Sequence, residues 1–269
     1  MTDTIESEDR VPLRRRLRSA AARLPRAVGR FVLDSLYPPV CLACEAPLAD
    51  ADTLCARCFT QLRPITAPLC PRLGIPFAVS IGPGALSAEA IADPPPFERA
   101  RSAVVYNEVA RTLVSRLKYG DRPELARFLA RLMAQAGAEF WAAKPLIVPV
   151  PLHPARQFAR RYNQSAELAA AVARLTGLRA DTALLRRTRR TRQQVGLTRE
   201  ARARNVAGAF TAHPEAVKRL AGRNVVLVDD VYTTGATLKA ATRALKRAGA
   251  GHIDVLTFAR VVTGGELPI

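Results

Sequence analysis

The sequence predicts an α/β protein whose main domain is a doubly wound, mostly parallel sheet, preceded by a small cysteine module. From about residue 101, short apolar runs alternate with longer segments of helical periodicity, as in parallel sheets. The run Val225–Val228 is apolar at every position, as in strands buried on both faces. Four cysteines in two CxxC pairs before residue 60 predict a separate metal-binding module.

The N-terminal segment is polar and then strongly basic. Residues 1–10 are acidic and polar, which predicts disorder. Residues 11–33 contain seven arginines and no acid, and apolar residues recur at helical spacing until Pro25. This stretch is either an amphipathic basic helix that touches DNA or membrane, or a packed or solvated helical lead-in.

The cysteine module has the spacing of a zinc site. Cys41 and Cys44 form one CxxC pair and Cys55 and Cys58 the other, with ten residues between the pairs. Four thiolates complete a tetrahedral zinc site and leave no position for water, so a structural Zn²⁺ is expected. The alternative is two redox pairs or free thiols. Cys70 stands alone and is expected in the core, because Leu73 occupies the place of a second CxxC cysteine.

The remaining elements follow from periodicity and from Gly and Pro boundaries. Strands are expected at 103–106, 146–150, 225–228 and 253–262, and helices at 108–118, 124–141, 163–176 and 238–248. Residues 74–97 resemble a connecting loop, and no internal repeat is evident. The predicted organisation is a basic segment at 1–36, a zinc ribbon at 37–73, a linker at 74–100 and the α/β domain at 101–269.

The stretch after Val225–Val228 combines acids with a hydroxyl-rich turn. Asp229 and Asp230 are expected just past the strand, at the edge where open α/β sheets bind ligands. A Thr- and Gly-containing turn then opens a helix at Thr237, whose free N–H groups suit a phosphate. The alternative is an ordinary strand–turn–helix with two surface acids.

This stretch closely resembles the signature with which type I phosphoribosyltransferases bind phosphoribosyl pyrophosphate (PRPP). The resemblance implies that Asp229 and Asp230 are the catalytic acids, which hold the ribose hydroxyls, and that Mg²⁺ accompanies PRPP. It implies that the rest of the motif binds PRPP: Val231 and Tyr232 belong to it, and the 5′-phosphate is held by Thr233, Thr234, Gly235, Ala236 and Thr237. It also implies a pyrophosphate loop after the strand at 146–150, with Pro151, Leu152, His153, Arg156 and Arg160, and with Arg161 nearby. Lys118 either reaches the same anion or is a lysine at a helix C-terminus.

The whole layout resembles the ComF family, in which a zinc ribbon precedes a phosphoribosyltransferase-like domain. The residues that carry this resemblance are 37–41, both CxxC pairs, 117–119, 148–152, Asn163-Gln164, 194–197 and the PRPP motif. The sequence departs from the family at Arg161, where members often have glycine, and in keeping only Cys70 of a second cysteine set. The resemblance implies a PRPP-dependent transferase linked to DNA uptake and to other competence proteins. The alternative is a non-enzymatic competence protein that binds single-stranded DNA with the same fold.

Composition favours an anionic partner. Lys and Arg number 41 against 23 acids, a net charge of +18, which suits nucleic acid, anionic membrane or phosphorylated ligands. Arginines cluster at 186–205. The resemblance implies that this segment is a mobile loop that closes over the reaction. The alternative is that its arginines bind nucleic-acid phosphates. No apolar run approaches the roughly 18 residues of a membrane span and no secretory signal is evident, so a cytoplasmic location is expected.

Overall fold

The computed structural model describes residues 38–119, 123–154, 162–189 and 198–262. The basic segment at 11–33, Arg156, Arg160, Arg161 and the stretch 194–197 lie outside these ranges. The elements are α3 (Ala56–Gln61), α4 (Ala88–Ala92), β1 (Arg99–Val105), α5 (Glu108–Tyr119), α6 (Pro123–Ala136), the 3-10 helix η1 (Ala138–Ala143), β2 (Leu146–Pro149), α8 (Gln164–Thr176), β3 (Leu185–Arg187), α9 (Arg199–Val206), β4 (Phe210–Ala212), α10 (Ala216–Leu220), β5 (Val225–Tyr232), α11 (Ala236–Arg247) and β6 (Ile253–Arg260). None of the helices in the described ranges is long and apolar enough to cross a membrane.

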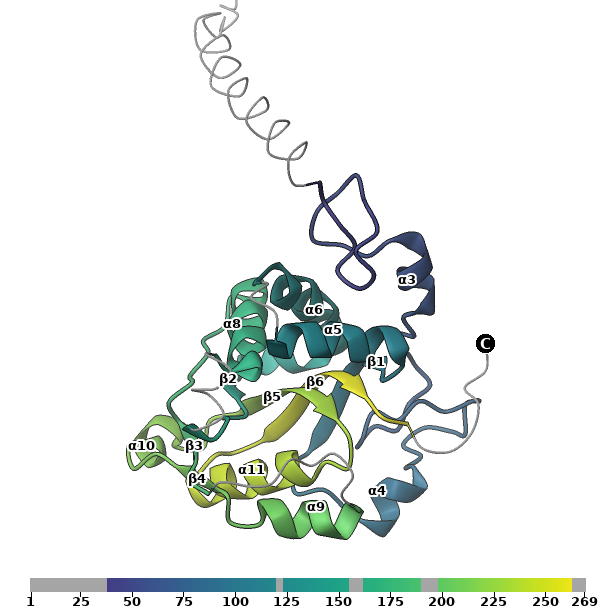
Figure 1. The fold of residues 1–269 in the computed structure, drawn as a ribbon. Helices are drawn as coiled ribbons and strands as arrows, with labels where there is room; N and C mark the ends of the chain where they lie inside the picture. Colours follow the sequence, from purple (N-terminus) through teal and green to yellow (C-terminus); the bar gives the residue numbers. More distant parts are fainter. Residues whose placement is uncertain (1–37, 120–122, 155–161, 190–197, 263–269) are drawn as a thin grey trace, which may run out of the picture. The chain divides into compact units, whose positions relative to one another are not determined.

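A parallel four-stranded sheet is the centre of the α/β domain. Its strand order is β1-β6-β5-β2, and all three pairings are parallel. Helices α5, α6 and α8 lie on one side of the sheet and α11 and α9 on the other (Figure 1). Every residue of β6 is buried, and so are Val225–Val228 of β5, which explains the continuous apolar run at 225–228. The doubly wound, mostly parallel fold predicted from the sequence is therefore confirmed.

Some predicted elements differ in extent. The helix expected at 124–141 ends at Ala136, and η1 continues after Gly137. A Cβ at Gly137 would lie 2.8 Å from the Trp141 ring, so a larger residue at this junction would have to displace that side chain. The short strands β3 and β4, which pair antiparallel outside the main sheet, were not predicted because three-residue strands leave almost no periodic signal.

The chain divides into two compact units after Thr53. In the first unit, residues 39–48 form a tight turn that begins at Cys41. Its three backbone bonds run from Cys41 N to Ala46 O, from Glu45 N to Cys41 O and from Leu48 N to Pro39 O.

The same turn recurs in the second unit, at residues 68–77. There the bonds run from Cys70 N to Ile75 O, from Gly74 N to Cys70 O and from Phe77 N to Pro68 O. A capped helix follows each turn, since Cys55 caps α3 and Ser87 caps α4 with a side-chain acceptor. The prediction that the chain has no internal repeat was therefore wrong. We call residues 68–93 the second ribbon segment.

Candidate functional site

The acid pair lies where the sheet loses one strand. The sequence predicted that Asp229 and Asp230 lie just past the strand. This prediction was wrong, because β5 extends through Tyr232 and both acids are inside it. Pairing with β2 ends at Val228, whereas pairing with β6 continues to Tyr232. The two acids therefore have a strand on one side only, at the carboxyl edge of the sheet where ligands of α/β folds bind.

Asp229 is fixed by two donors. Its Oδ1 accepts from Ser165 Oγ at 2.8 Å and from the backbone N–H of Asp230 at 2.9 Å. Burial and the neighbouring charge of Asp230 raise the pKa of Asp229 to about 7, although both hydrogen bonds and Lys118 act in the opposite direction. A carboxyl group with such a pKa changes its charge in the physiological range, which is common at functional sites.

Asp230 is paired with a lysine from another helix. Lys118 Nζ lies 2.9 Å from Asp230 Oδ2, and the exposed fractions of these side chains are 26% and 9%. Lys118 lies in the last turn of α5, far from the acids in sequence. The sequence left open whether this lysine reaches an anion, and the anion it contacts here is the acid pair itself.

The N-terminus of α8 faces Asp229. Asn163 caps the helix with its Oδ1, which accepts from Ser165 N at 3.1 Å, and its Nδ2 donates to Val150 O at 3.1 Å. This cap directs Ser165 towards Asp229, and the positive end of the helix favours the ionised carboxylate. Ser165 was not predicted from the sequence, although it directly follows the Asn163-Gln164 pair, which carries part of the family resemblance.

Residues 233–237, which we call the threonine loop, lead into α11, and no side chain caps the N-terminus of this helix. Gly235 is the N-cap of α11 with φ +72°, and the structure gives α11 no side-chain cap, unlike α3, α4, α8 and α9. A Cβ at Gly235 would lie 2.4 Å from the Tyr232 hydroxyl, so only glycine fits. The first N–H groups of α11 therefore lack the oxygen that usually satisfies them, as at helix N-termini that bind phosphate.

Several side-chain atoms in these segments are buried without a hydrogen-bond partner in the described part of the chain. Thr234 Oγ1 and Gln164 Oε1 are among them. Such atoms are rare in folded proteins unless a ligand or water satisfies them. The Thr234 hydroxyl can donate to a phosphate, whereas Gln164 Oε1 and the carboxylates can accept from sugar hydroxyls, so this combination fits a sugar phosphate.

The predicted pyrophosphate loop leaves the same edge of the sheet. Pro151, Leu152 and His153 directly follow β2, whose last residue pairs with Val228 of β5. The three residues are partly buried. Arg156 and Arg160 lie outside the described residues, so their part in the loop stays a prediction.

Two arginines of the basic stretch have structural contacts. The Arg187 guanidinium stacks 5.2 Å from the centre of the Phe210 ring. Arg189 Nη2 donates to the carbonyls of Arg204, Asn205 and Ala207, which satisfies the C-terminal end of α9. These two arginines therefore hold β3, β4 and α9 together, whereas residues 190–197 lie outside the described ranges.

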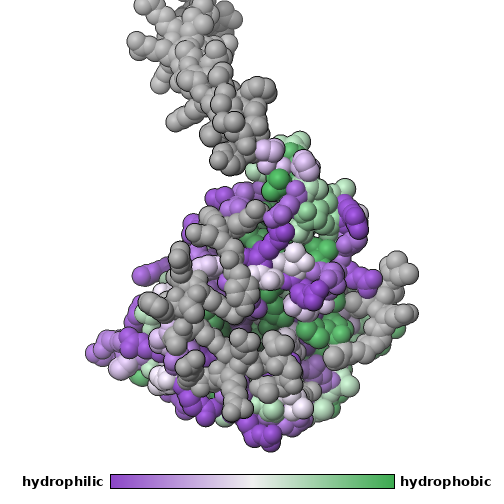
Figure 2. All heavy atoms as spheres, viewed as in Figure 1, coloured by the Kyte–Doolittle hydropathy of each residue, from purple (hydrophilic) through white to green (hydrophobic). Residues whose placement is uncertain are grey.

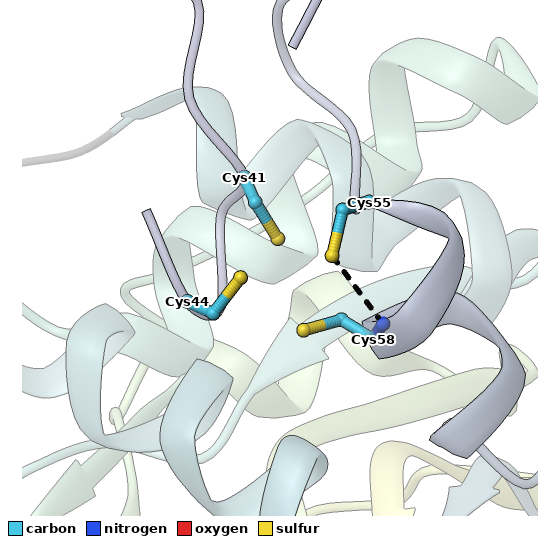
Figure 3. Close-up of side chains that lie close together, drawn as sticks. All are labelled: Cys41, Cys44, Cys55 and Cys58. Carbon is cyan, nitrogen blue, oxygen red and sulfur yellow. Dashed lines mark hydrogen bonds between the residues drawn. The ribbon is translucent and has the colours of Figure 1, made fainter. Parts of the chain in front are cut away.

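The four cysteines of the CxxC pairs converge (Figure 3). The Sγ atoms of Cys41, Cys44, Cys55 and Cys58 all lie within 4.8 Å of one another. Thiolates that bind one zinc at about 2.3 Å are just under 4 Å apart, so this cluster fits a tetrahedral Zn²⁺ after small adjustments. A fifth cysteine, Cys70, is completely buried in an apolar cluster with Leu73 and Ala90.

The parallel sheet with its acid pair and uncapped helix, together with the four-cysteine cluster, agrees with the zinc ribbon and phosphoribosyltransferase-like domain expected from the sequence. Residues 115–268 match the model of the phosphoribosyl transferase domain, and residues 32–91 match that of the double zinc ribbon domain. The chain therefore belongs to the ComF family of such proteins.

Named relatives support the same family. The chain is 32% identical over 234 residues to DNA utilization protein YhgH of Salmonella typhimurium, covering 84% of this chain and 98% of the relative. It is 32% identical over 160 residues to Competence protein F of Haemophilus influenzae, covering 58% and 69%. It is 25% identical over 245 residues to Competence protein ComFC of Bacillus subtilis, covering 84% and 96%.

Proposed function

We propose that this protein binds PRPP together with Mg²⁺ and transfers or recognises its phosphoribosyl group, in a process linked to DNA utilization. The main support is the acid pair next to an uncapped helix, with the unpartnered Thr234 hydroxyl between them. The names of the relatives, which refer to DNA utilization and competence, support the process but not the substrate.

In this proposal, different residues at the carboxyl edge of the sheet bind different parts of PRPP. Asp229 and Asp230 accept hydrogen bonds from the ribose 2′- and 3′-hydroxyls, and the loop 233–237 donates to the 5′-phosphate. The loop 151–153, with Arg156 and Arg160, holds the pyrophosphate. Bound Mg²⁺ would neutralise the pyrophosphate charge that grows as the bond to C1′ breaks.

Lys118 and Ser165 prepare the acid pair for the sugar. Lys118 compensates the charge of Asp230, and Ser165 fixes one oxygen of Asp229. The other carboxylate oxygens can accept the hydroxyls without rearrangement, which avoids part of the ordering cost of binding.

The test is calorimetric titration of PRPP with Mg²⁺ into the full chain. In the Asp229→Asn/Asp230→Asn variant we expect PRPP to bind about 100-fold more weakly, because two charge-assisted hydrogen bonds at about 1.5 kcal/mol each are weakened. The control is Asp254→Asn, a buried acid near the start of β6 that pairs with Arg99. Equal affinity in both variants, or no binding by the wild type, contradicts the proposal.

A second candidate function, binding of single-stranded DNA, is favoured by a basic cavity at the opposite edge of the sheet. This cavity of about 420 Å³ lies by Leu146, the first residue of β2. Its charged lining residues are Arg179, Lys218, Arg219, Arg223 and Asp181. Arg219 is bonded to Asp181, which leaves an excess of three cations. The tip formed by α10, which carries Lys218 and Arg219, is hydrophilic in Figure 2.

Reversing two charges of this cavity tests the DNA candidate. We expect Lys218→Glu/Arg223→Glu to weaken binding of a single-stranded oligonucleotide at least tenfold at 50 mM salt, with a smaller salt dependence and unchanged PRPP binding, because phosphate contacts are lost. Fluorescence anisotropy at 50 and 200 mM salt measures this. The control Arg243→Glu/Arg247→Glu makes the same change in net charge on the exposed face of α11. Equal weakening by both variants contradicts a specific role of the cavity.

A further inference from the structure

The second ribbon segment has no set of metal ligands, and packing holds it instead. Its residues at the positions of the four zinc cysteines are Cys70, Leu73, Ser87 and Ala90, all buried. Leu73 and Ala90 cannot bind a metal, and they join the apolar cluster of the α/β domain. The segment also contacts two basic residues near the threonine loop. Arg260 contacts a backbone carbonyl and a carboxylate of the segment, and Lys239 contacts another carboxylate.

We propose that Arg260, held by the second ribbon segment, is a positioning residue for the loop 233–237, an inference that rests on the function proposed for that loop. Arg260 is the last residue of β6 and is 1% exposed. Its Nη1 donates to Leu73 O at 2.6 Å, and its Nη2 lies 3.6 Å from Glu89 Oε2. Both partners belong to the second ribbon segment.

The guanidinium of Arg260 also contacts Tyr232, the last residue of β5, which directly precedes the loop. Arg260 Cζ lies 4.2 Å from the centre of the Tyr232 ring, in cation–π geometry. Phe97 packs edge-on against the same ring, with 6.4 Å between ring centres and an interplanar angle of 89°. Burial raises the pKa of Tyr232 to about 12, so the ring is neutral at physiological pH.

Tyr232 in turn determines where the loop turns. Its hydroxyl would lie 2.4 Å from a Cβ at Gly235, so the ring and the glycine backbone are in close contact. A shift of the ring would move the Gly235 turn, and with it the first N–H groups of α11. Contacts thus run from Leu73 and Glu89 through Arg260 and Tyr232 to Gly235.

A second contact holds the helix that follows the loop. Lys239, in the first turn of α11, has an 8% exposed side chain, and its Nζ lies 2.6 Å from Asp93 Oδ2. Asp93 is the C-cap of α4, in the second ribbon segment. The segment therefore holds both flanks of the loop. Arg260 contacts Tyr232, which precedes the loop, and Lys239 lies in α11, which follows it.

The test substitutes Arg260→Met, which keeps most of the volume and removes the charge and the donors. We expect PRPP with Mg²⁺ to bind about tenfold more weakly by calorimetry, because the loop must be ordered on binding. We also expect the amides of residues 232–238 to exchange about tenfold faster by hydrogen exchange in the absence of PRPP.

Arg101→Met is the matched control. Arg101 is also buried, and its Nη1 donates to Pro71 O of the same segment at 3.0 Å. It lies on β1 opposite Leu256, four residues before Arg260 along β6. Its loss weakens the attachment of the segment away from the loop, so exchange at 232–238 and PRPP affinity should stay within twofold of wild type.

The outcomes separate this inference from the proposed function. If the wild type binds no PRPP, the proposed function fails, and hydrogen exchange alone decides the positioning role. If Arg260→Met does not fold, Glu89→Gln removes the counter-charge from a more exposed position and should give about threefold effects. The inference is overturned if exchange at 232–238 and PRPP binding are the same in Arg260→Met as in Arg101→Met, or if Glu89→Gln matches wild type.

Discussion

Removal of zinc is expected to unfold residues 40–58 while the α/β domain stays folded. Few apolar side chains are buried in this stretch, chiefly Leu42 and Leu54, so packing contributes little there. Structural zinc contributes on the order of 10 kcal/mol in small zinc modules, and four thiolates without a cation repel one another. Hydrogen exchange before and after chelation should show loss of protection at 40–58 and retained protection in β5, β6 and α8.

One zinc per chain is expected, because the described residues form one four-cysteine cluster, although the chain matches a double zinc ribbon. Elemental analysis should give one zinc for wild type, none for Cys41→Ser and one for Cys70→Ser. Cys70→Ser is the matched control, because Cys70 has the same place in the second turn but Leu73 and Ala90 stand beside it. Two zinc ions in the wild type, or loss of zinc in Cys70→Ser, would show that the second ribbon segment binds metal.

The parts of the site that could be predicted are those encoded within one stretch of sequence. The acids and the turn at Gly235 are contiguous, and each CxxC pair places two thiolates on one turn. Their chemistry could be inferred because local backbone geometry brings these groups together. The strand end was misplaced by four residues, because β5 continues beside β6 after β2 has ended.

The missed parts depend on distant segments. Nothing local to Lys118 or Ser165 indicates that they meet the acid pair, since α5 and α8 arrive there only through packing. The second ribbon segment was missed because three of its four ligand positions hold other residues, which removes the CxxC signal and leaves the turn visible only in the backbone bonds. Similarly, Arg260 is the last residue of β6, and nothing in the sequence around it shows that its side chain is buried.

Replacing Asp229 with Asn is expected to stabilise the fold at neutral and alkaline pH by about 2 to 4 kcal/mol. The pKa of Asp229 rises from 3.8 to about 7 on folding, so between these values the folded state holds a proton that the unfolded state has released. The wild type therefore loses stability as pH rises from about 4 to 7, and the loss is constant above 7. Asn does not titrate, and its Oδ1 can still accept from Ser165. Urea unfolding of both proteins at pH 5 and pH 8 measures the difference.

Ser165→Ala provides the control for the sign of this effect. It removes a hydrogen bond that lowers the pKa of Asp229, so the pH range in which stability falls should extend above 7. A difference between Asp229→Asn and wild type that is the same at both pH values would contradict the shifted pKa. The affinity for PRPP should change in the opposite direction and rise through pH 7. Oδ1 of Asp229 already accepts two hydrogen bonds, so a proton on Asp229 removes the acceptor that remains for a ribose hydroxyl. The acid pair would then be kept at a cost in stability that is largest where PRPP binding is strongest, as is common for functional sites.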